Sequence, residues 1–200
     1  MRRRARQPPL PSSGWCAALA LVVVCASLRA GAEDVAVPIS LQMNLLLKVA
    51  SYDKNLKRRA GDRVRVAVVV RADDADSGRC AAQALKALEE TSELDGLPLD
   101  RLSTTYTDGA ALARFTHDGA VSILYVTPGF SDSDVVAIAR GLDGVNVLSV
   151  GALAKYTPLG MVLGFDLAGG KPKLTVNLGR ARRQNVELSS SVLKLMRVIE

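Results

Sequence analysis

Two neighbouring carboxylates, Asp73 and Asp74, stand just past the apolar segment VRVAVVV and could hold a divalent cation. Carboxylate oxygens are the ligands that magnesium and calcium prefer. A receiver-type magnesium site also needs a phosphate-accepting Asp after the third strand, and this chain has Thr127 there. An EF-hand loop is excluded because Gly78 comes one position early and no Glu stands at the twelfth position. We therefore predict a solvated turn, with weak calcium binding by Asp73, Asp74 and Asp76 as the remaining alternative.

His117 is the only histidine, so any site that needs two imidazoles is excluded. It stands just before an apolar run, in the segment FTHDG, where we predict a turn. A catalytic His would also need an activated nucleophile, and the chain has no G-x-S-x-G motif. The P-loop and the H-E-x-x-H zinc motif do not occur either. We predict no catalytic residue, no metal site and no cofactor, and we expect a protein that is not an enzyme.

The first 32 residues have the order of a secretory signal peptide. Arginines in residues 2–6 precede an apolar run over residues 15–28, which is shorter than the roughly 20 residues that span a bilayer. The small residues Ala30, Gly31 and Ala32 follow, and they predict cleavage after Ala32. An uncleaved anchor is the competing interpretation. Export would leave a single domain over residues 33–200.

Removal of this segment changes the net charge of the chain and the number of its cysteines. The net charge of the whole chain is +6, but residues 33–200 carry 21 basic and 20 acidic residues, which argues against a nucleic-acid partner. Cys16 and Cys25 leave with the segment, so Cys80 cannot close an internal disulfide. We expect Cys80 to be buried in a helix, with an exposed redox or intermolecular thiol as the alternative.

Apolar periodicity predicts alternating helices and strands. In the first helix, residues 39–56, apolar side chains recur at steps of four, four, three and four, which is one stripe of an amphipathic helix. That stripe consists of Leu41, Leu45, Val49, Tyr52 and Leu56. The further elements are predicted at 64–70 (strand), 80–94 (helix), 102–106 (strand), 110–115 (helix), 121–126 (strand), 131–140 (helix), 145–150 (strand), 161–167 with 173–178 (hairpin) and 188–199 (helix).

This order predicts an α/β fold in a single domain. The sheet is mostly parallel, with helices on both faces and an antiparallel hairpin at one edge. The last helix packs an apolar face that includes Leu195 and exposes Lys194 and Arg197.

Two sets of residues are candidates for binding. Open α/β sheets bind small ligands at the loops that follow the parallel strands. These loops contain Asp73, Asp108, Thr127, Gly129, Phe130 and Gly151. Basic residues near the C-terminus could instead meet an anionic partner or a lipid head-group surface, although a solvated face is their ordinary role. These are Arg180, Arg183, Lys194 and Arg197.

The C-terminal segment LTVNLGRARRQNVELSSSVLKLMRVI resembles the YfiR-like family of bacterial periplasmic proteins. The segments VRVAVVV, VSILYVTPG and VNVLSVG agree in order, so the similarity covers residues 40–200 in outline. The matching C-terminal positions are Phe165, Val176, Asn177, Leu178, Ala181, Ser190 and residues 193–195.

The resemblance implies a periplasmic repressor that binds the sensory domain of an inner-membrane diguanylate cyclase. Two departures weaken the transfer. The family's Trp-Pro ending of the first helix is replaced here by residues 57–61, and the disulfides of the repressor type cannot form with Cys80 alone.

We expect a non-enzymatic periplasmic protein that binds the periplasmic part of a membrane sensor. A small-ligand-binding protein is the alternative, and pairing of two copies through an edge strand or the basic helix faces stays open.

Overall fold

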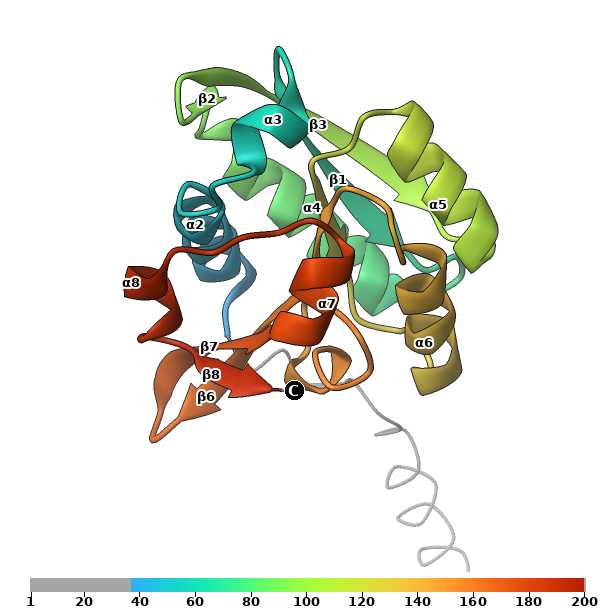
Figure 1. Ribbon diagram of the computed structural model, residues 1–200. Coiled ribbons are helices and arrows are strands. Elements are labelled where there is room, and N and C mark those ends of the chain that lie inside the picture. The colour runs from blue at the N-terminus through green and yellow to red at the C-terminus, as the bar shows by residue number, and fades with distance from the viewer. Residues whose placement is uncertain (1–36, 200) are drawn as a thin grey trace, which may run out of the picture. The chain divides into compact units, whose positions relative to one another are not determined.

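Figure 1 shows the computed structural model of the protein, which describes residues 37–199. The predicted signal peptide and its cleavage after Ala32 lie outside the described residues. The strands are β1 Val64–Val70, β2 Glu93–Leu94, β3 Leu97–Thr105, β4 Ile123–Val126, β5 Leu148–Gly151, β6 Leu163–Ala168, β7 Lys171–Asn177 and β8 Arg197–Ile199. The helices are α2 Ile39–Ala50, α3 Leu56–Ala60, α4 Ala75–Glu89, α5 Gly109–Asp118, α6 Asp132–Gly141, the 3-10 helix η1 Ala154–Tyr156, α7 Leu178–Arg183 and α8 Ser190–Leu193.

The strands form one eight-stranded sheet in the order β2-β3-β1-β4-β5-β6-β7-β8. Strands β3, β1, β4, β5 and β6 are parallel, and β7 folds back antiparallel to β6. The predicted α/β fold with a mostly parallel sheet and an antiparallel hairpin is confirmed. Two short strands that the sequence did not predict extend it, because β2 pairs antiparallel with β3 and β8 pairs parallel with β7.

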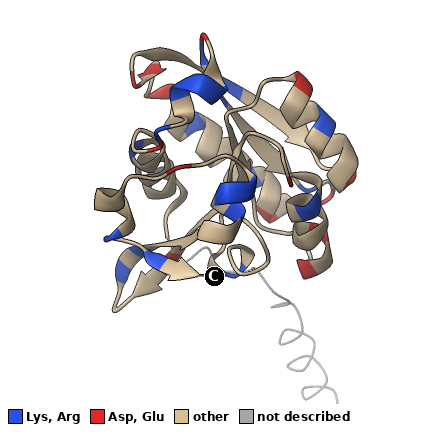
Figure 2. Cartoon of the chain, viewed as in Figure 1, with Lys and Arg blue, Asp and Glu red and all other residues tan. Residues whose placement is uncertain are grey.

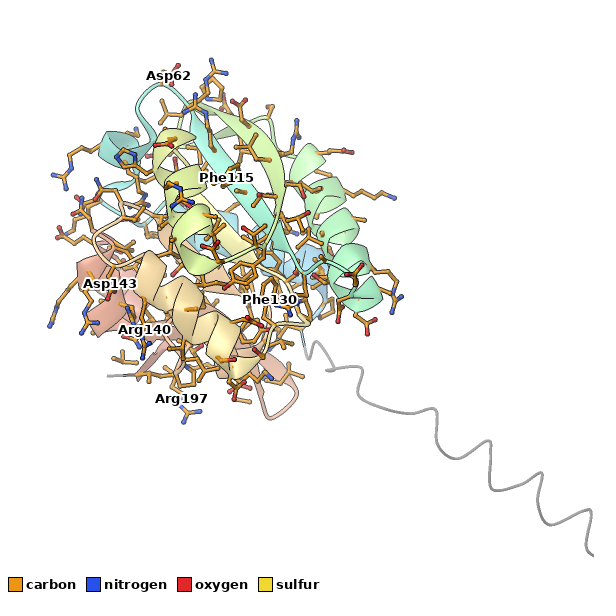
Figure 3. The ribbon with its side chains drawn as sticks, turned by 90° about the vertical axis from the view of Figure 1, so that its right-hand side faces the viewer. Asp62, Phe115, Phe130, Arg140, Asp143 and Arg197 are labelled. Carbon is orange, nitrogen blue, oxygen red and sulfur yellow. The ribbon has the colours of Figure 1, made fainter. Side chains whose placement is uncertain are left out.

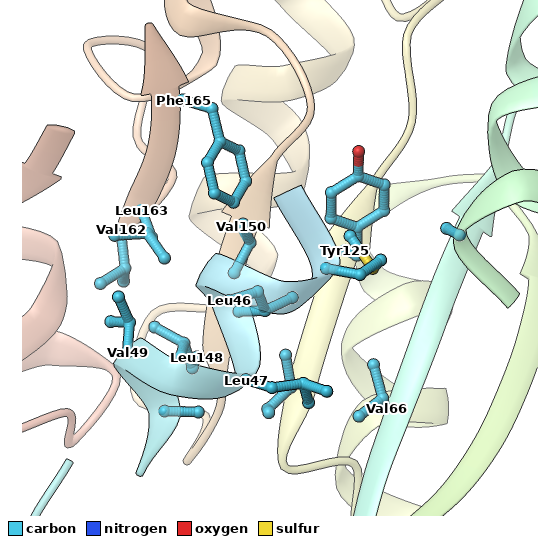
Figure 4. Close-up of a cluster of buried hydrophobic side chains, with 14 of the residues drawn as sticks. Leu46, Leu47, Val49, Val66, Tyr125, Leu148, Val150, Val162, Leu163 and Phe165 are labelled. Carbon is cyan, nitrogen blue, oxygen red and sulfur yellow. The ribbon is translucent and has the colours of Figure 1, made fainter. Parts of the chain in front are cut away.

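Strand β1 shows why the sheet needs helices on both faces. Val66 and Val68 belong to one buried cluster, whereas Ala67 and Val69 belong to another. Helices α2 and α4 cover the first cluster and α5 and α6 the second, so they lie on opposite sides of the sheet in Figure 1. In the close-up of Figure 4, Leu46 of α2 lies over Val150 of β5 and beside Tyr125 of β4.

Side-chain caps fix where the helices begin. The carboxylate of Asp74 accepts a hydrogen bond from the backbone N–H of Ser77, so α4 starts at Ala75 rather than at Cys80. Residues 75–78, predicted as loop, are therefore the first turn of this helix. Ser131 and Asp134 form a reciprocal capping box at α6, which begins one residue after the start predicted at residue 131.

Three other helix predictions were wrong in their bounds. The first predicted helix divides into α2 and α3, separated by a turn at residues 51–55. Helix α4 ends at Glu89, and residues 93–94 form β2 instead of continuing it. Helix α5 continues to Asp118, so His117 lies in its last turn and not in a turn between elements.

The largest correction concerns the C-terminus. The helix predicted over residues 188–199 is reduced to α8, and residues 197–199 form β8. The periodicity of Leu188, Val192, Leu195 and Ile199 fits a helix, but the pairing of β8 with the open edge of β7 competes with it. Leu195, predicted to pack inward, is 67% exposed.

Candidate functional site: an apolar groove

The loops after the parallel strands come together at the point where the strand order reverses. Strand β1 lies between β3 and β4, and the crevice at the carboxyl ends of β1 and β4 is where open α/β sheets usually bind ligands. Thr127 lies there, fully buried, and its hydroxyl donates to the carbonyl of Val69 at 2.7 Å. It also lies 2.6 Å from the hydroxyl of Ser77. The Thr127 hydroxyl is therefore occupied by the protein's own groups.

Aromatic side chains fill the space between these loops. Phe130 is buried, and its ring meets that of Tyr106 edge-on with centroids 5.3 Å apart. The backbone N–H of Phe130 donates to the hydroxyl of Tyr156 at 3.2 Å. The guanidinium of Arg71 lies 5.9 Å from the Phe130 ring centroid and forms an ion pair with Asp134 at 2.8 Å. Figure 3 shows Phe130 on the side of the molecule that carries α5 and α6.

The two candidate glycines explain how the loops pack so closely. A Cβ atom on Gly151 would lie 2.5 Å from the Cβ of Tyr156, so a side chain there would push the tyrosine away. Gly129 has a φ of +93° and lies against the carboxylate of Asp74, where a Cβ atom would be 2.6 Å from Cγ. Asp108 caps α5 through the N–H of Ala111. These residues hold the loops together as structural elements.

The phenol of Tyr106 in this crevice has a raised pKa. Burial raises the pKa of its phenol above the usual value, and the carboxylates of Asp134 and Asp108 raise it further. The phenol is therefore neutral at physiological pH and can act as a hydrogen-bond donor.

Three of the four basic residues predicted for partner contact are paired with carboxylates. Arg180 and Arg183 of α7 both reach Asp143, which follows α6, and Arg180 also donates to the carbonyl of Ala139. Figure 3 shows Asp143 beside α7. Arg197 of β8 lies 3.9 Å from Asp166. Lys194, at the end of α8, has no carboxylate partner among residues 37–199.

An open groove of about 310 Å³ lies between α2 and α8, with Leu174 of β7 between them. We call it the α2/α8 groove. Its lining residues are Leu45, Lys48, Val49, Tyr52, Leu174, Ser191, Val192 and Leu195. Tyr52 and Leu195 are 42% and 67% exposed, and together with the other apolar lining residues they form a contiguous apolar surface.

The groove explains the two faces of α2. Its buried face consists of Ile39, Gln42, Met43, Leu46, Leu47, Val49 and Ala50. Of the apolar stripe that the sequence predicted, only Val49 lies on this buried face of α2. Leu41 is 36% exposed and Leu45 is half-buried. Helix α2 and the turn after it thus carry a second apolar stripe that this domain covers only in part.

A buried ion pair holds the two walls of the groove in place. The Asp53 carboxylate lies 2.6 Å from the Arg59 guanidinium, and both side chains are almost completely buried. Asp53 also accepts hydrogen bonds from the backbone N–H groups of Asn55 and Glu187. Arg59 donates to the carbonyl of Ser122. The turn after α2 is therefore tied to the chain segment that leads into α8.

Backbone hydrogen bonds reinforce this connection. The N–H of Lys54 donates to the carbonyl of Glu187, and the N–H of Ser189 donates to that of Tyr52. Asp53 and Leu188 form an isolated antiparallel bridge. The spacing between α2 and α8 is consequently fixed by the fold and does not depend on a bound partner.

The described residues offer little for catalysis or metal binding. No group of three or more His, Cys, Asp or Glu side chains within residues 37–199 could hold a metal ion. The His117 ring is exposed, and its Nδ1 lies 3.0 Å from the carboxylate of Asp118. Cys80 is buried, as expected, and burial raises the pKa of its thiol to about 11. Among the helices that the structure describes, none is long and apolar enough to cross a membrane.

Solved structures with a similar fold include two bacterial proteins. A conserved domain protein from Vibrio cholerae O1 biovar El Tor strain N16961 matches with a TM-score of 0.56 and 14% identity, over 82% of this chain and 60% of that chain. The ABC domain from Streptococcus pneumoniae, in complex with L-Trp, matches with a TM-score of 0.52 and 10% identity, over 76% of this chain and 62% of that chain. This chain thus spans about three fifths of each of them, and at such identities the likeness shows the fold alone. A search of curated proteins gives no match.

The fold and the groove define a doubly wound α/β domain whose exposed apolar feature is the α2/α8 groove. The chain belongs to the family described as DUF4154: YfiR/HmsC-like, which it matches over residues 40–197. This is a regulatory family of periplasmic proteins, and the resemblance drawn from the sequence is confirmed.

Proposed function

We propose that this protein is a non-enzymatic regulator that binds the periplasmic part of a membrane sensor or signalling protein through the α2/α8 groove. The observation that carries the proposal is the exposure of Tyr52 and Leu195 on the walls of a preformed apolar groove. Exposed apolar patches of this kind mark binding surfaces in soluble proteins. The fixed spacing of the walls favours binding because little ordering is needed when the partner arrives.

Export supports the same proposal. Residues 1–32 have the composition of a signal peptide, and cleavage after Ala32 would release the domain into the periplasm. The family is periplasmic. A diguanylate cyclase is the partner that the family resemblance suggests, and restraint of its activity is the corresponding role.

Site-specific photo-crosslinking in living cells tests the proposal. A photoreactive amino acid at position 52 or 195 should give an adduct with a membrane protein that has a periplasmic segment. Leu167 is the matched control, because it is 40% exposed but lies on the β6–β7 hairpin and not in the groove. Adducts with soluble proteins only, or equal adducts from position 167, would contradict the proposal.

A substitution in the groove tests the regulatory role. Leu195→Asp should abolish the membrane adduct at position 52 while leaving the fold intact, because Leu195 is mostly exposed. If the partner is a diguanylate cyclase, cellular cyclic-di-GMP should rise in this variant and equally in a strain that lacks the gene. Unchanged cyclic-di-GMP in both strains would remove the cyclase as the partner.

The second function predicted from the sequence is binding of a small ligand at the strand-end loops. Its support is the partly exposed Arg71–Asp134 pair at the reversal of strand order. A ligand present at a hundredfold its dissociation constant should stabilise the protein by about 2.7 kcal/mol. Thermal unfolding with a panel of anionic and aromatic metabolites measures this, and Arg71→Ala should remove the shift.

A further inference from the structure

The charges at the α2/α8 groove indicate what kind of chain it binds. Lys48 is the only charged residue among those that line it, and it projects from α2. Lys194 stands at the end of α8, next to the exposed Leu195. Neither lysine has a carboxylate partner among residues 37–199, whereas Glu187, the nearest acidic residue in the segment that leads to α8, is paired with Lys54 at 2.7 Å.

Lys48 thus lies in the lining of the groove, and Lys194 lies next to the lining residue Leu195, at the rim on the α8 side. In Figure 2, basic residues mark the turn after α8 and the neighbouring β6–β7 hairpin. A partner with carboxylates on either side of an apolar stripe would meet opposite charge at Lys48 in the groove and at Lys194 beside it, while a basic partner would meet like charge. The groove thus selects for acidic flanks.

The backbone hydrogen bonds of α2 and α8 indicate which conformation a segment bound in the groove adopts. The amide groups of α2 are bonded within the helix, and the N–H groups of residues 193–196 donate to carbonyls of residues 189–193. The hydroxyl of Ser191 lies 2.9 Å from that of Ser189. An extended chain in this groove would find few donors or acceptors, and its own peptide groups would lose their hydrogen bonds to water. A helix satisfies its peptide groups internally.

We propose that the α2/α8 groove binds an amphipathic helix whose apolar stripe is flanked by Asp or Glu. The helix lies between α2 and α8, inserts apolar side chains against Leu174, Tyr52 and Leu195, and places carboxylates near Lys48 and Lys194. This inference rests on the proposed function for the location of the binding site, and it adds the chemistry and the conformation of the partner segment.

Binding of labelled peptides to the purified protein tests the proposal. The probe is a fluorescein-labelled peptide of about 18 residues, roughly five helical turns, with Leu at positions i, i+3, i+4 and i+7 and Glu on both flanks. The first control replaces every Glu by Lys, and the second keeps the Glu peptide but inserts one central Pro. Fluorescence anisotropy at low salt should show the Glu peptide binding at least about tenfold more tightly than either control.

Charge reversal on the protein provides the decisive comparison. The double variant Lys48→Glu with Lys194→Glu should exchange the preferences, so that the Lys peptide binds more tightly than the Glu peptide. Both side chains are exposed, and the circular dichroism spectrum should stay unchanged. Equal affinities of the Glu and Lys peptides, or tight binding of the Pro peptide, would overturn the proposal.

The two proposals can fail separately. Membrane-protein adducts at positions 52 and 195, together with no charge preference among peptides, would retain the proposed function and reject the acidic helix. A charge-selective peptide site without membrane adducts in cells would retain the groove chemistry and reject the proposed function.

Discussion

At the scale of single residues, Cys80 should be inert towards thiol reagents in the folded protein. Burial raises the pKa of its thiol to about 11, partly offset by the hydroxyl of Tyr125 at 3.8 Å. Only the thiolate reacts, and at pH 8 about one thiol in a thousand is ionised when the pKa is about 11. Iodoacetamide labelling of residues 33–200 at pH 8, followed by mass spectrometry, should be at least about a hundredfold slower than labelling in denaturant. Rapid labelling of the native protein would contradict the buried position.

The same pKa makes stability depend on pH in the alkaline range. The native thiol keeps its proton up to a pH of about 11, while the unfolded thiol ionises near its ordinary value. The native state therefore binds more protons between these values, and the free energy of unfolding should fall as pH rises from 9 to 11. Cys80→Ala should show a smaller decline over that range in urea titrations. An identical decline in both proteins would assign the effect to other groups.

The buried pair of Asp53 and Arg59 should contribute far more to stability than an exposed pair in the same turn. Removing one partner leaves the other charge buried without compensation, which costs about 3–5 kcal/mol. Asp53→Ala should lower the free energy of unfolding by this amount. The matched control is Lys54→Ala, which breaks the exposed pair with Glu187 and should change it by less than about 1 kcal/mol. If urea unfolding gave similar losses of free energy for the two variants, Asp53 would not be the link between the turn after α2 and the segment that leads into α8.

At the scale of elements, two glycines determine how closely α5 and α6 approach. A Cβ atom on Gly109 would lie 2.5 Å from the backbone oxygen of Ala137, and one on Gly141 would lie 2.4 Å from that of Gly109. Gly109→Ala should therefore force the helices apart and destabilise the protein by about 1–3 kcal/mol. Gly78 in α4 is the control, because no atom lies within 4 Å of its added Cβ, and Gly78→Ala should stabilise by about 0.5–1 kcal/mol. Thermal unfolding of both variants measures the difference in sign.

The elements also show which parts of the structure the sequence could predict. Continuous β-branched runs such as β1 and the capping box at Ser131 are local signals, and both were placed correctly. Strand β8 depends on pairing with β7, which is not a local signal, so the apolar period of residues 188–199 was interpreted as a helix. Of the four basic residues predicted for partner contact, Lys194 lies next to a groove-lining residue and Arg180 is bound to Asp143.

The groove itself was missed for a physical reason. Apolar periodicity identifies a stripe but does not say whether another element covers it. Helix α2 has apolar residues around most of its circumference, and only the stripe with Leu45 and Tyr52 was identified from the sequence. The available signal was that a helix with two apolar stripes needs two covers, while the predicted sheet supplied one. A comparison of the number of apolar stripes on this helix with the number of elements that could pack against them indicates one uncovered face.

At the scale of the whole molecule, the two clusters of the core should unfold together. Strand β1 belongs to both, through Val68 on the face of α2 and Val69 on the face of α6, and both side chains are fully buried. Loss of either face exposes the strand that supports the other, which favours a single cooperative transition. Val68→Ala and Val69→Ala should each lower the free energy of unfolding by about 2 kcal/mol.

Two probes on opposite faces of the sheet measure this coupling. Tyr125 belongs to the first cluster and Tyr156 to the second, so fluorine-labelled tyrosines report on each face separately by NMR. Both signals should lose intensity at the same urea concentration in the native chain, and each Val→Ala variant should shift both midpoints equally. If Val68→Ala shifted the transition of Tyr125 alone, the sheet would not couple its two faces. The walls of the α2/α8 groove could then open without unfolding the crevice at the strand ends, and the groove could no longer be treated as a preformed site.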